Sequence, residues 1–246
     1  MNKVIIVPAR YQSSRFPGKP LVDILGISMI CRVWNKCVEI LPAKYIFVAT
    51  DSKEIAEHCK SNKIQVLMTS SNCLTGTDRV YEASKQFDSK TMIINVQGDE
   101  PLINSEDIQA VIDAAENNPN MVINAMCPIV IERDYRSVNI PKVVFRPDGR
   151  LLYMSRSPIP IGKNNNFSKA WKQVCIYAFP SHILERYSNK GKKTPLEEIE
   201  DIEILRFIEL GYDVHMIKVS SSSIAVDIPE DVERVKDVIR EKSIGA

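Results

Sequence analysis

The chain opens with VIIVPARYQSSRFPGKPL at residues 4–21, and the class of fold can be inferred from this composition. Four consecutive apolar residues are typical of a strand that is buried on both faces, as in a parallel sheet. The residues that follow include three prolines and the cations Arg10, Arg15 and Lys19, which predict a turn-rich loop. A buried strand that leads directly into a cationic loop suggests an α/β protein that binds an anion at this junction.

Strand and helix patterns alternate from residue 1 to about residue 118. This alternation predicts a Rossmann-like, doubly wound α/β fold with a mostly parallel sheet. Ligands of such sheets bind at the carboxyl ends of the strands, so we expect the loops 8–19, 74–79 and 97–101 to form one cleft. Further strands are predicted at 44–51, 64–69 and 91–103, and helices at 28–41, 52–62 (capped by Ser52), 75–87 and 105–118 (capped by Ser105).

The second half of the chain has a different pattern. Strands joined by turns predict an antiparallel insertion at 121–190, within a single domain that spans 1–246. A strand-rich insert of this kind could bury a partner surface. Residues 195–211 predict one amphipathic helix closed by Gly211, followed by a strand and by a last helix with Pro229 in its first turn.

Composition excludes several classes of protein. The 32 basic and 31 acidic residues nearly cancel, and the aromatic content of 7% is scattered, which argues against a nucleic-acid binder. The six cysteines form no C-x-x-C pair, which favours reduced thiols in the cytoplasm. No apolar stretch approaches the roughly 20 residues of a membrane span, so no membrane partner is expected.

The first loop has the chemistry of a triphosphate cradle. Arg10, Arg15 and Lys19 lie among Ser13, Ser14 and glycine, and cations, hydroxyls and backbone N–H groups together bind phosphates. The loop matches neither G-x-x-x-x-G-K-[ST] nor G-x-G-x-x-G. The same residues could instead form a solvated basic turn.

Two aspartates also follow predicted strands. Asp99 lies in NVQGDEP and Asp227 in AVDIPED. Taken alone, the first could belong to an ordinary acidic turn and the second could be a helix cap. Together, facing a cationic loop, they indicate a Mg²⁺ site for phosphoryl or nucleotidyl transfer, because Mg²⁺ binds one or two carboxylates plus phosphate oxygens.

The motifs IIVPARYQSSRFPGKPL, VATD, TGTDRV, INVQGDEPLI, PKVVF, LLYMSRSPIP, PLEEIEDIEILR and VDIPEDVERV, taken in this order, resemble the 3-deoxy-manno-octulosonate (Kdo) cytidylyltransferases, or CMP-Kdo synthetases. The resemblance implies a fold of the nucleotide-diphospho-sugar transferase type. It also implies a Mg²⁺-dependent homodimer that transfers CMP from CTP to a 2-keto-3-deoxy sugar acid for lipopolysaccharide biosynthesis. On this resemblance, the insertion at 121–190 would form the dimer contact and lie on the sugar side of the site.

On matching positions, the resemblance implies catalytic roles for Arg10, Lys19, Asp99 and Asp227, the last two holding the metal. It implies CTP contacts by Pro8, Ala9, Arg10, Ser13, Lys19, Met68, Thr69, Thr75, Gly76 and Thr77. It implies sugar contacts by Arg15, Gln97, Tyr153, Arg156, Gln173, Tyr177 and Glu203.

Two positions depart from the family pattern on the sugar side. Gln173 stands where the family has histidine, and Ile204 where it has glutamine. Loss of such hydrogen-bonding groups can change the accepted sugar, so a modified acceptor such as 8-amino-Kdo or a sialic-type acid stays possible beside Kdo. The same motifs are also compatible with a non-catalytic sugar-nucleotide sensor and with a transferase for another base.

Overall fold

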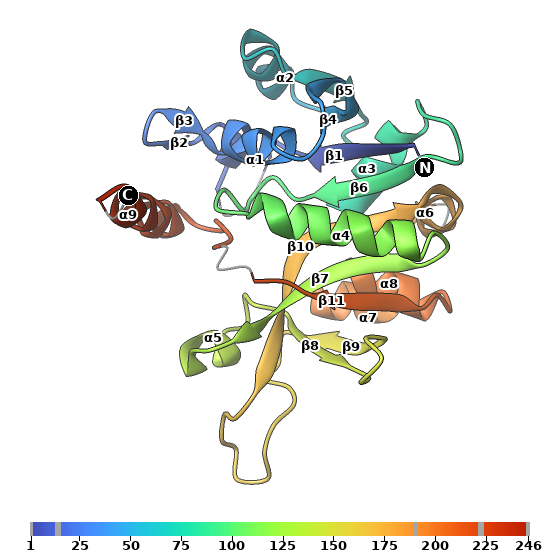
Figure 1. Cartoon of the computed structure of the whole chain (residues 1–246), viewed down its shortest axis with the longest axis vertical. Helices are drawn as coiled ribbons and strands as arrows, with labels where there is room; N and C mark the ends of the chain where they lie inside the picture. The colour runs from blue at the N-terminus through green and yellow to red at the C-terminus, as the bar shows by residue number, and fades with distance from the viewer. Residues whose placement is uncertain (1, 13–15, 189–190, 221–223, 245–246) are drawn as a thin grey trace.

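The computed structural model describes residues 2–12, 16–188, 191–220 and 224–244. Its framework is a nine-stranded sheet in the order β11-β7-β10-β6-β1-β4-β5, with β8 and β9 branching off beside β10 (Figure 1). The strands along this order are β11 (Val214–Lys218), β7 (Val122–Ile129), β10 (Ala170–Pro180), β6 (Met92–Val96), β1 (Lys3–Pro8), β4 (Ile46–Thr50) and β5 (Gln65–Met68).

The sheet is mostly parallel, as predicted. β1 pairs in parallel with β4 and β6, β4 with β5, and β7 with β11. Only β10 runs against its neighbours on this path, β6 and β7. β7 and β10 therefore place the predicted strand-rich segment inside the main sheet, while β8 (Lys142–Phe145) and β9 (Leu151–Ser155) form a hairpin beside it.

Helices cover both faces of the sheet. α1 (Met29–Val38), α2 (Lys53–Ser61) and α4 (Ser105–Asn117) bury apolar side chains on one face, and α3 (Gly76–Ser84), α6 (Ser181–Ser188) and α8 (Ile204–Glu209) on the other. This sandwich explains why β6 is buried at every position and β1 at all but its first. Strands covered on both faces need continuous apolar runs rather than alternation.

Helix starts follow the sequence signals closely. The predicted cap at Ser52 is confirmed, since its hydroxyl accepts a hydrogen bond from the Ile55 N–H at 3.2 Å. The predicted cap at Ser105 is wrong by one residue, because Asn104 holds the extended cap conformation and Ser105 is already helical. α9 (Pro229–Ile244) begins at Pro229, as expected, and packs against the short β2 (Asp23–Ile24).

The single helix predicted at 195–211 is wrong. The structure has two short helices, α7 (Pro195–Glu200) and α8, separated by Asp201 in the left-handed conformation at φ 50°. The Arg156 guanidinium takes the carbonyls of Glu200 and Asp201, which a continuous helix would need for its own hydrogen bonds. Tertiary contacts therefore end α7 where helical periodicity continues.

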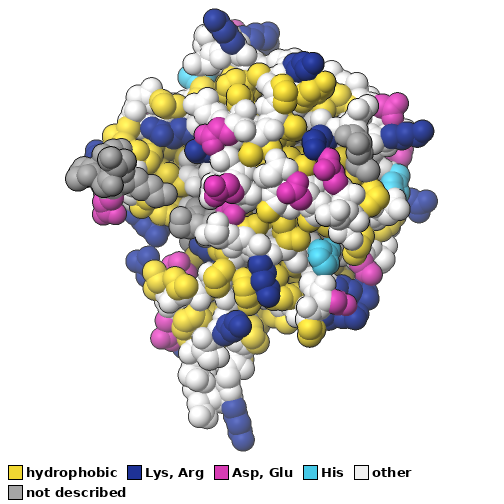
Figure 2. Space-filling view, viewed as in Figure 1, with side chains coloured by type: hydrophobic (Ala, Val, Ile, Leu, Met, Phe, Trp, Pro, Cys, Tyr) yellow, Lys and Arg dark blue, Asp and Glu magenta, His cyan; other side chains and the backbone are white. Residues whose placement is uncertain are grey.

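The visible face of the molecule carries no dominant charge. Figure 2 shows basic and acidic side chains interspersed over this face, in agreement with the near-neutral net charge. Among the described residues, no helix is long and apolar enough to cross a membrane.

Candidate active site

The three predicted loops meet at the carboxyl edge of the sheet. They follow β1, β5 and β6 and line a cavity of about 270 Å³. A second cavity of about 410 Å³ adjoins it. Both cavities are lined by Gln97, Asp99, Asp201, Glu203 and Asp227, and the first also by the predicted residues Pro8, Ala9, Arg10, Lys19, Thr75 and Gly76.

Lys19 is the cation at the centre of the first cavity's charged cluster. It begins the short helix η1 (Lys19–Leu21) directly after Gly18, whose φ of 72° lies in the left-handed region that favours glycine. Its Nζ lies 3.2 Å from Asp99 Oδ2 and 3.8 Å from Asp227 Oδ1, and it donates to the Val226 carbonyl at 2.7 Å. Three segments far apart in the sequence thus meet at one ammonium group.

The two aspartates suit a magnesium ion. Asp99 Oδ1 is buried and has no hydrogen-bond partner among the described residues, although a buried carboxylate oxygen ordinarily requires one. Asp227 presents a second carboxylate to the same ammonium group. Hard oxygen ligands of this kind, supplemented by phosphate oxygens, match the preference of Mg²⁺. The predicted metal role of Asp99 and Asp227 therefore stays a prediction that fits the donor set.

Glu203 closes the amino end of α3. Its Oε1 accepts from the Gly76 N–H at 3.0 Å, and its Oε2 accepts from the Thr77 N–H at 2.8 Å and from the Thr77 hydroxyl. Burial raises the pKa of the Glu203 carboxyl group, and the hydrogen bonds from Thr77 and Gly76 oppose this. A Cβ on Gly76 would lie 2.9 Å from Gln97 Nε2, so a larger residue there would require the Gln97 side chain to shift.

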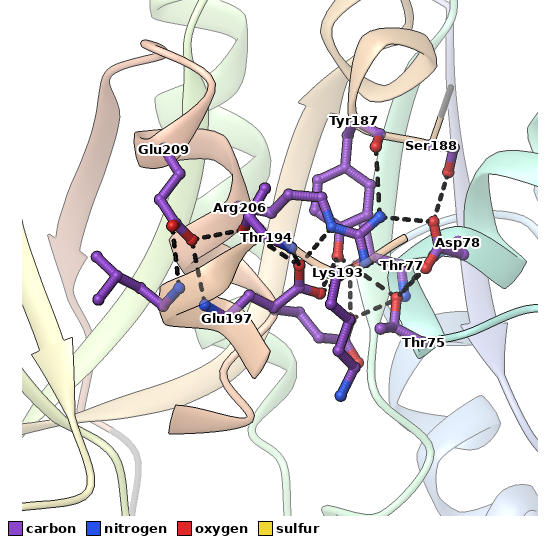
Figure 3. A network of polar contacts seen from close by, with 12 residues as sticks. Thr75, Thr77, Asp78, Tyr187, Ser188, Lys193, Thr194, Glu197, Arg206 and Glu209 are labelled. Atoms are coloured by element: carbon purple, nitrogen blue, oxygen red, sulfur yellow. Dashed lines mark hydrogen bonds and ion pairs between the residues drawn. The ribbon is translucent and has the colours of Figure 1, made fainter. Parts of the chain in front are cut away.

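A buried network of ion pairs and hydrogen bonds holds the start of α3, which Glu203 caps (Figure 3). Arg206 of α8 is fully buried and forms a two-bond pair with Glu197, with both distances at 2.6 Å. It also donates to Asp78 of α3 at 2.9 Å and stacks over the Tyr187 ring at 3.8 Å. Asp78 in turn accepts a hydrogen bond from the Thr75 hydroxyl. The network thus joins the start of α3 to α6, α7 and α8.

The predicted sugar side lies in the second cavity. Arg156, Gln173 and Tyr177 line it, together with the shared residues Gln97 and Glu203. Gln173 Nε2 donates to Asn124 Oδ1 at 3.0 Å, which holds the side-chain amide in one orientation. Burial raises the pKa of the Tyr177 hydroxyl well above its usual range, so this hydroxyl stays protonated and can donate.

Some predicted residues lie elsewhere. Neither Met68 nor Thr69 lines the two cavities within the described part of the chain, and Tyr153 also lies outside both linings and donates to Glu200 at 3.2 Å. Thr77 is buried against Glu203 rather than lining either cavity in the described structure. Ile204 is 1% exposed within the apolar core, so its difference from the family does not face the second cavity. Ser13 and Arg15 fall outside the described residues.

Sequence reasoning assigned no individual role to several residues that line the cavities. Glu100 is buried beside the second cavity, where its Oε1 accepts from the Cys175 N–H at 3.1 Å. Arg79 and Asp201 line the first cavity. Arg79 belongs to the loop 74–79 that was expected at the cleft, but nothing in TGTDRV distinguishes a buried arginine from an exposed one.

The fold and the site together define a class of protein. A Rossmann-like sheet whose carboxyl edge gathers a lysine and two aspartates is an arrangement suited to a nucleotidyltransferase. The chain belongs to the cytidylyltransferase family, because the family model described as "Cytidylyltransferase" matches residues 4–218.

Individual relatives agree with this assignment. The chain is 38% identical to the mitochondrial 3-deoxy-manno-octulosonate cytidylyltransferase of Arabidopsis thaliana, over 98% of the chain and 84% of that protein. It is 31% identical to the 3-deoxy-manno-octulosonate cytidylyltransferase of Escherichia coli, over 97% and 96%. A solved structure of CMP:2-keto-3-deoxy-manno-octonic acid synthetase complexed with CTP superposes with a TM-score of 0.90 at 31% identity, covering 98% of the chain and all of that one.

Proposed function

We propose that this protein transfers CMP from CTP to the anomeric hydroxyl of Kdo, which yields CMP-Kdo and pyrophosphate. The observation that carries the proposal is the meeting of Lys19, Asp99 and Asp227 between two adjoining polar cavities. Relatives that share 31–38% identity carry the name of this activity.

The residues present can support an in-line transfer. The anomeric hydroxyl of the sugar attacks the α-phosphorus of CTP and releases its proton to solvent, while the bond from that phosphorus to the β-phosphate oxygen breaks and pyrophosphate leaves. Lys19 and Arg10 would offset the negative charge on the triphosphate and on the leaving pyrophosphate. Asp99 and Asp227 would hold Mg²⁺, which when bound supplies Lewis-acid neutralisation of phosphate charge.

Positioning supplies most of the remaining rate enhancement. Glu203 and Gln97 line both cavities, so they are placed to contact a sugar that approaches the nucleotide. The hydrogen bonds from the Gly76 and Thr77 N–H groups hold the Glu203 carboxylate in place. Holding two substrates in reactive geometry is worth several orders of magnitude in rate.

Gln173 would decide which groups the accepted sugar carries at the end far from its anomeric hydroxyl. Of the two departures from the family pattern, only this one lines the sugar cavity in the described structure. An amide fixed by Asn124 offers a neutral carbonyl oxygen where a histidine could offer a charge. A modified ulosonic acid, such as the 8-amino analogue, is therefore the second candidate acceptor.

We further propose that the enzyme acts as a cytoplasmic homodimer that supplies an activated sugar for lipopolysaccharide assembly. Support for the dimer comes from apolar side chains that segment 121–190 leaves exposed, such as Val130 at 80% and Val138 at 65%. Sedimentation analysis tests this arrangement, and a monomer at micromolar concentration would contradict it.

The first experiment measures pyrophosphate release from CTP and Mg²⁺ with Kdo, its 8-amino analogue and a sialic-type acid. Release with Kdo supports the proposal, and release only with another acid moves the assignment to that acceptor. Asp99→Asn is the matched control, because it keeps the shape of the side chain and removes the charge. Binding of CTP and sugar without any release would instead indicate the non-catalytic sensor.

A further inference from the structure

Arg79 is a buried cation that the proposed chemistry does not use. It belongs to α3, is 4% exposed and lines the first cavity beside Cys73, Leu74 and Thr75. A guanidinium group is rarely buried without a polar partner or a ligand. Its position on the cavity wall therefore requires an account of its own.

One end of the guanidinium group is anchored by the protein. Arg79 Nη1 donates to the Thr69 hydroxyl at 2.6 Å and to the Ser70 carbonyl at 3.5 Å, and it lies 3.3 Å from Asp51 Oδ1. These partners hold the plane of the group in place. Nε and Nη2 have no hydrogen-bond partner among the residues that the structure describes, so a fork of two donors is left for a ligand.

The order of the sheet shows which part of a nucleotide this fork can reach. Asp51 and Thr69 follow β4 and β5, which lie on the far side of β1 from β6 and its Asp99. Neighbouring strands are about 5 Å apart, so these anchors lie roughly 10–15 Å from the end of β6. That span matches the distance from the phosphates of a nucleoside triphosphate to its base. Arg79 therefore lies at the base end of the cavity.

We propose that Arg79 selects cytosine by donating two hydrogen bonds, from Nε and Nη2, to the N3 and O2 acceptors of the base. Uracil presents an N–H at position 3, so the same fork would meet a donor there and lose one bond. The inference rests on the proposed use of CTP and adds a residue that decides which pyrimidine enters. Asp51 and Thr69 act as positioning residues for the fork.

Calorimetric titration of the full chain with CTP, UTP and 3-deaza-CTP tests the assignment without any mutation. The 3-deaza compound keeps the shape of CTP and lacks only the N3 acceptor. We expect wild-type protein to bind CTP about 10- to 100-fold more tightly than either analogue, since hydrogen bonds to charged groups have this value. Arg79→Lys keeps the charge beside Asp51 but loses the fork, so its affinities for the three nucleotides should agree within about threefold.

Arg206→Lys is the matched control, because Arg206 is equally buried, lies on the same side of the sheet and lines neither cavity in the described structure. It should change all three affinities by the same factor. Equal weakening of the three ligands in Arg79→Lys, with the wild-type ratios preserved, would overturn the role of Arg79. Equal binding of CTP and 3-deaza-CTP by the wild type would also overturn it, while CTP turnover would still stand. Failure to bind CTP at all would remove the proposed function and this inference together.

Discussion

Replacement of Arg206 by methionine should destabilise this protein more than most single substitutions. The substitution keeps much of the side-chain volume and removes the charge that joins Glu197 and Asp78. The Arg206 and Glu197 side chains are both fully inaccessible, and Asp78 retains only 11% exposure. The variant would therefore leave the Glu197 carboxylate buried without its counter-ion. The Asp78 carboxylate would lose its arginine partner and keep the hydrogen bond from the Thr75 hydroxyl.

The expected loss follows from that burial. Removing one partner of a buried ion pair typically costs about 3–5 kcal/mol, because the other charge stays desolvated and unpaired. Exposed pairs contribute roughly 0–1 kcal/mol, so the burial of Glu197 decides which value applies. For a chain of this length, the same loss corresponds to a melting temperature lower by roughly 6–20 °C.

Urea unfolding followed by circular dichroism measures this loss directly. The double variant Glu197→Gln with Arg206→Met should recover part of the stability, because no full charge then remains buried at position 197. A single-variant loss below about 1 kcal/mol, or no recovery in the double variant, would refute the reasoning that the uncompensated carboxylate dominates.

Three further outcomes can be checked. Lys19→Ala should lower kcat about 100-fold or more while changing unfolding only slightly, as steady-state kinetics beside a thermal melt would show. Glu203→Gln should cost about 1–3 kcal/mol in urea unfolding, because an amide N–H₂ would face the Gly76 and Thr77 donors. Burial, with a smaller contribution from a nearby arginine, lowers the pKa of Lys142 from 10.5 to about 8. The unfolded chain binds more protons between these values, so the free energy of unfolding should rise with pH across them by roughly 3 kcal/mol, and Lys142→Met should abolish that rise.

Local sequence patterns correctly predicted the elements whose structure depends on neighbouring residues alone. The apolar runs of β1 and β6 are visible in the sequence because strands covered on both faces need apolar residues at every position. The convergence of Lys19 and Asp99 was also predictable, since parallel strands end at the same edge of a sheet. The cap at Ser52 followed from one side chain and its own helix.

Other features required the folded chain. The break at Asp201 was not predictable, because the carbonyls there are taken by Arg156, a residue 45 positions away in the sequence. Ile204 was expected on the sugar side, yet it packs in the core because α8 starts afresh after that break and turns this position inward. The helical periodicity of the sequence does not show where a tertiary contact ends a helix or how the next helix is oriented.

The sequence by itself determined the alternating strands and helices of the first 118 residues, the cationic loop and the acidic strand ends, because each depends on residues adjacent along the chain. Only the tertiary structure decided that Arg206 joins Asp78 to Glu197 and that Arg79 faces the nucleotide cavity. A buried arginine and an exposed one have the same local pattern. The two differ in whether the guanidinium group is desolvated and in which carboxylate it pairs with. Both properties depend on segments that meet only when the sheet has formed.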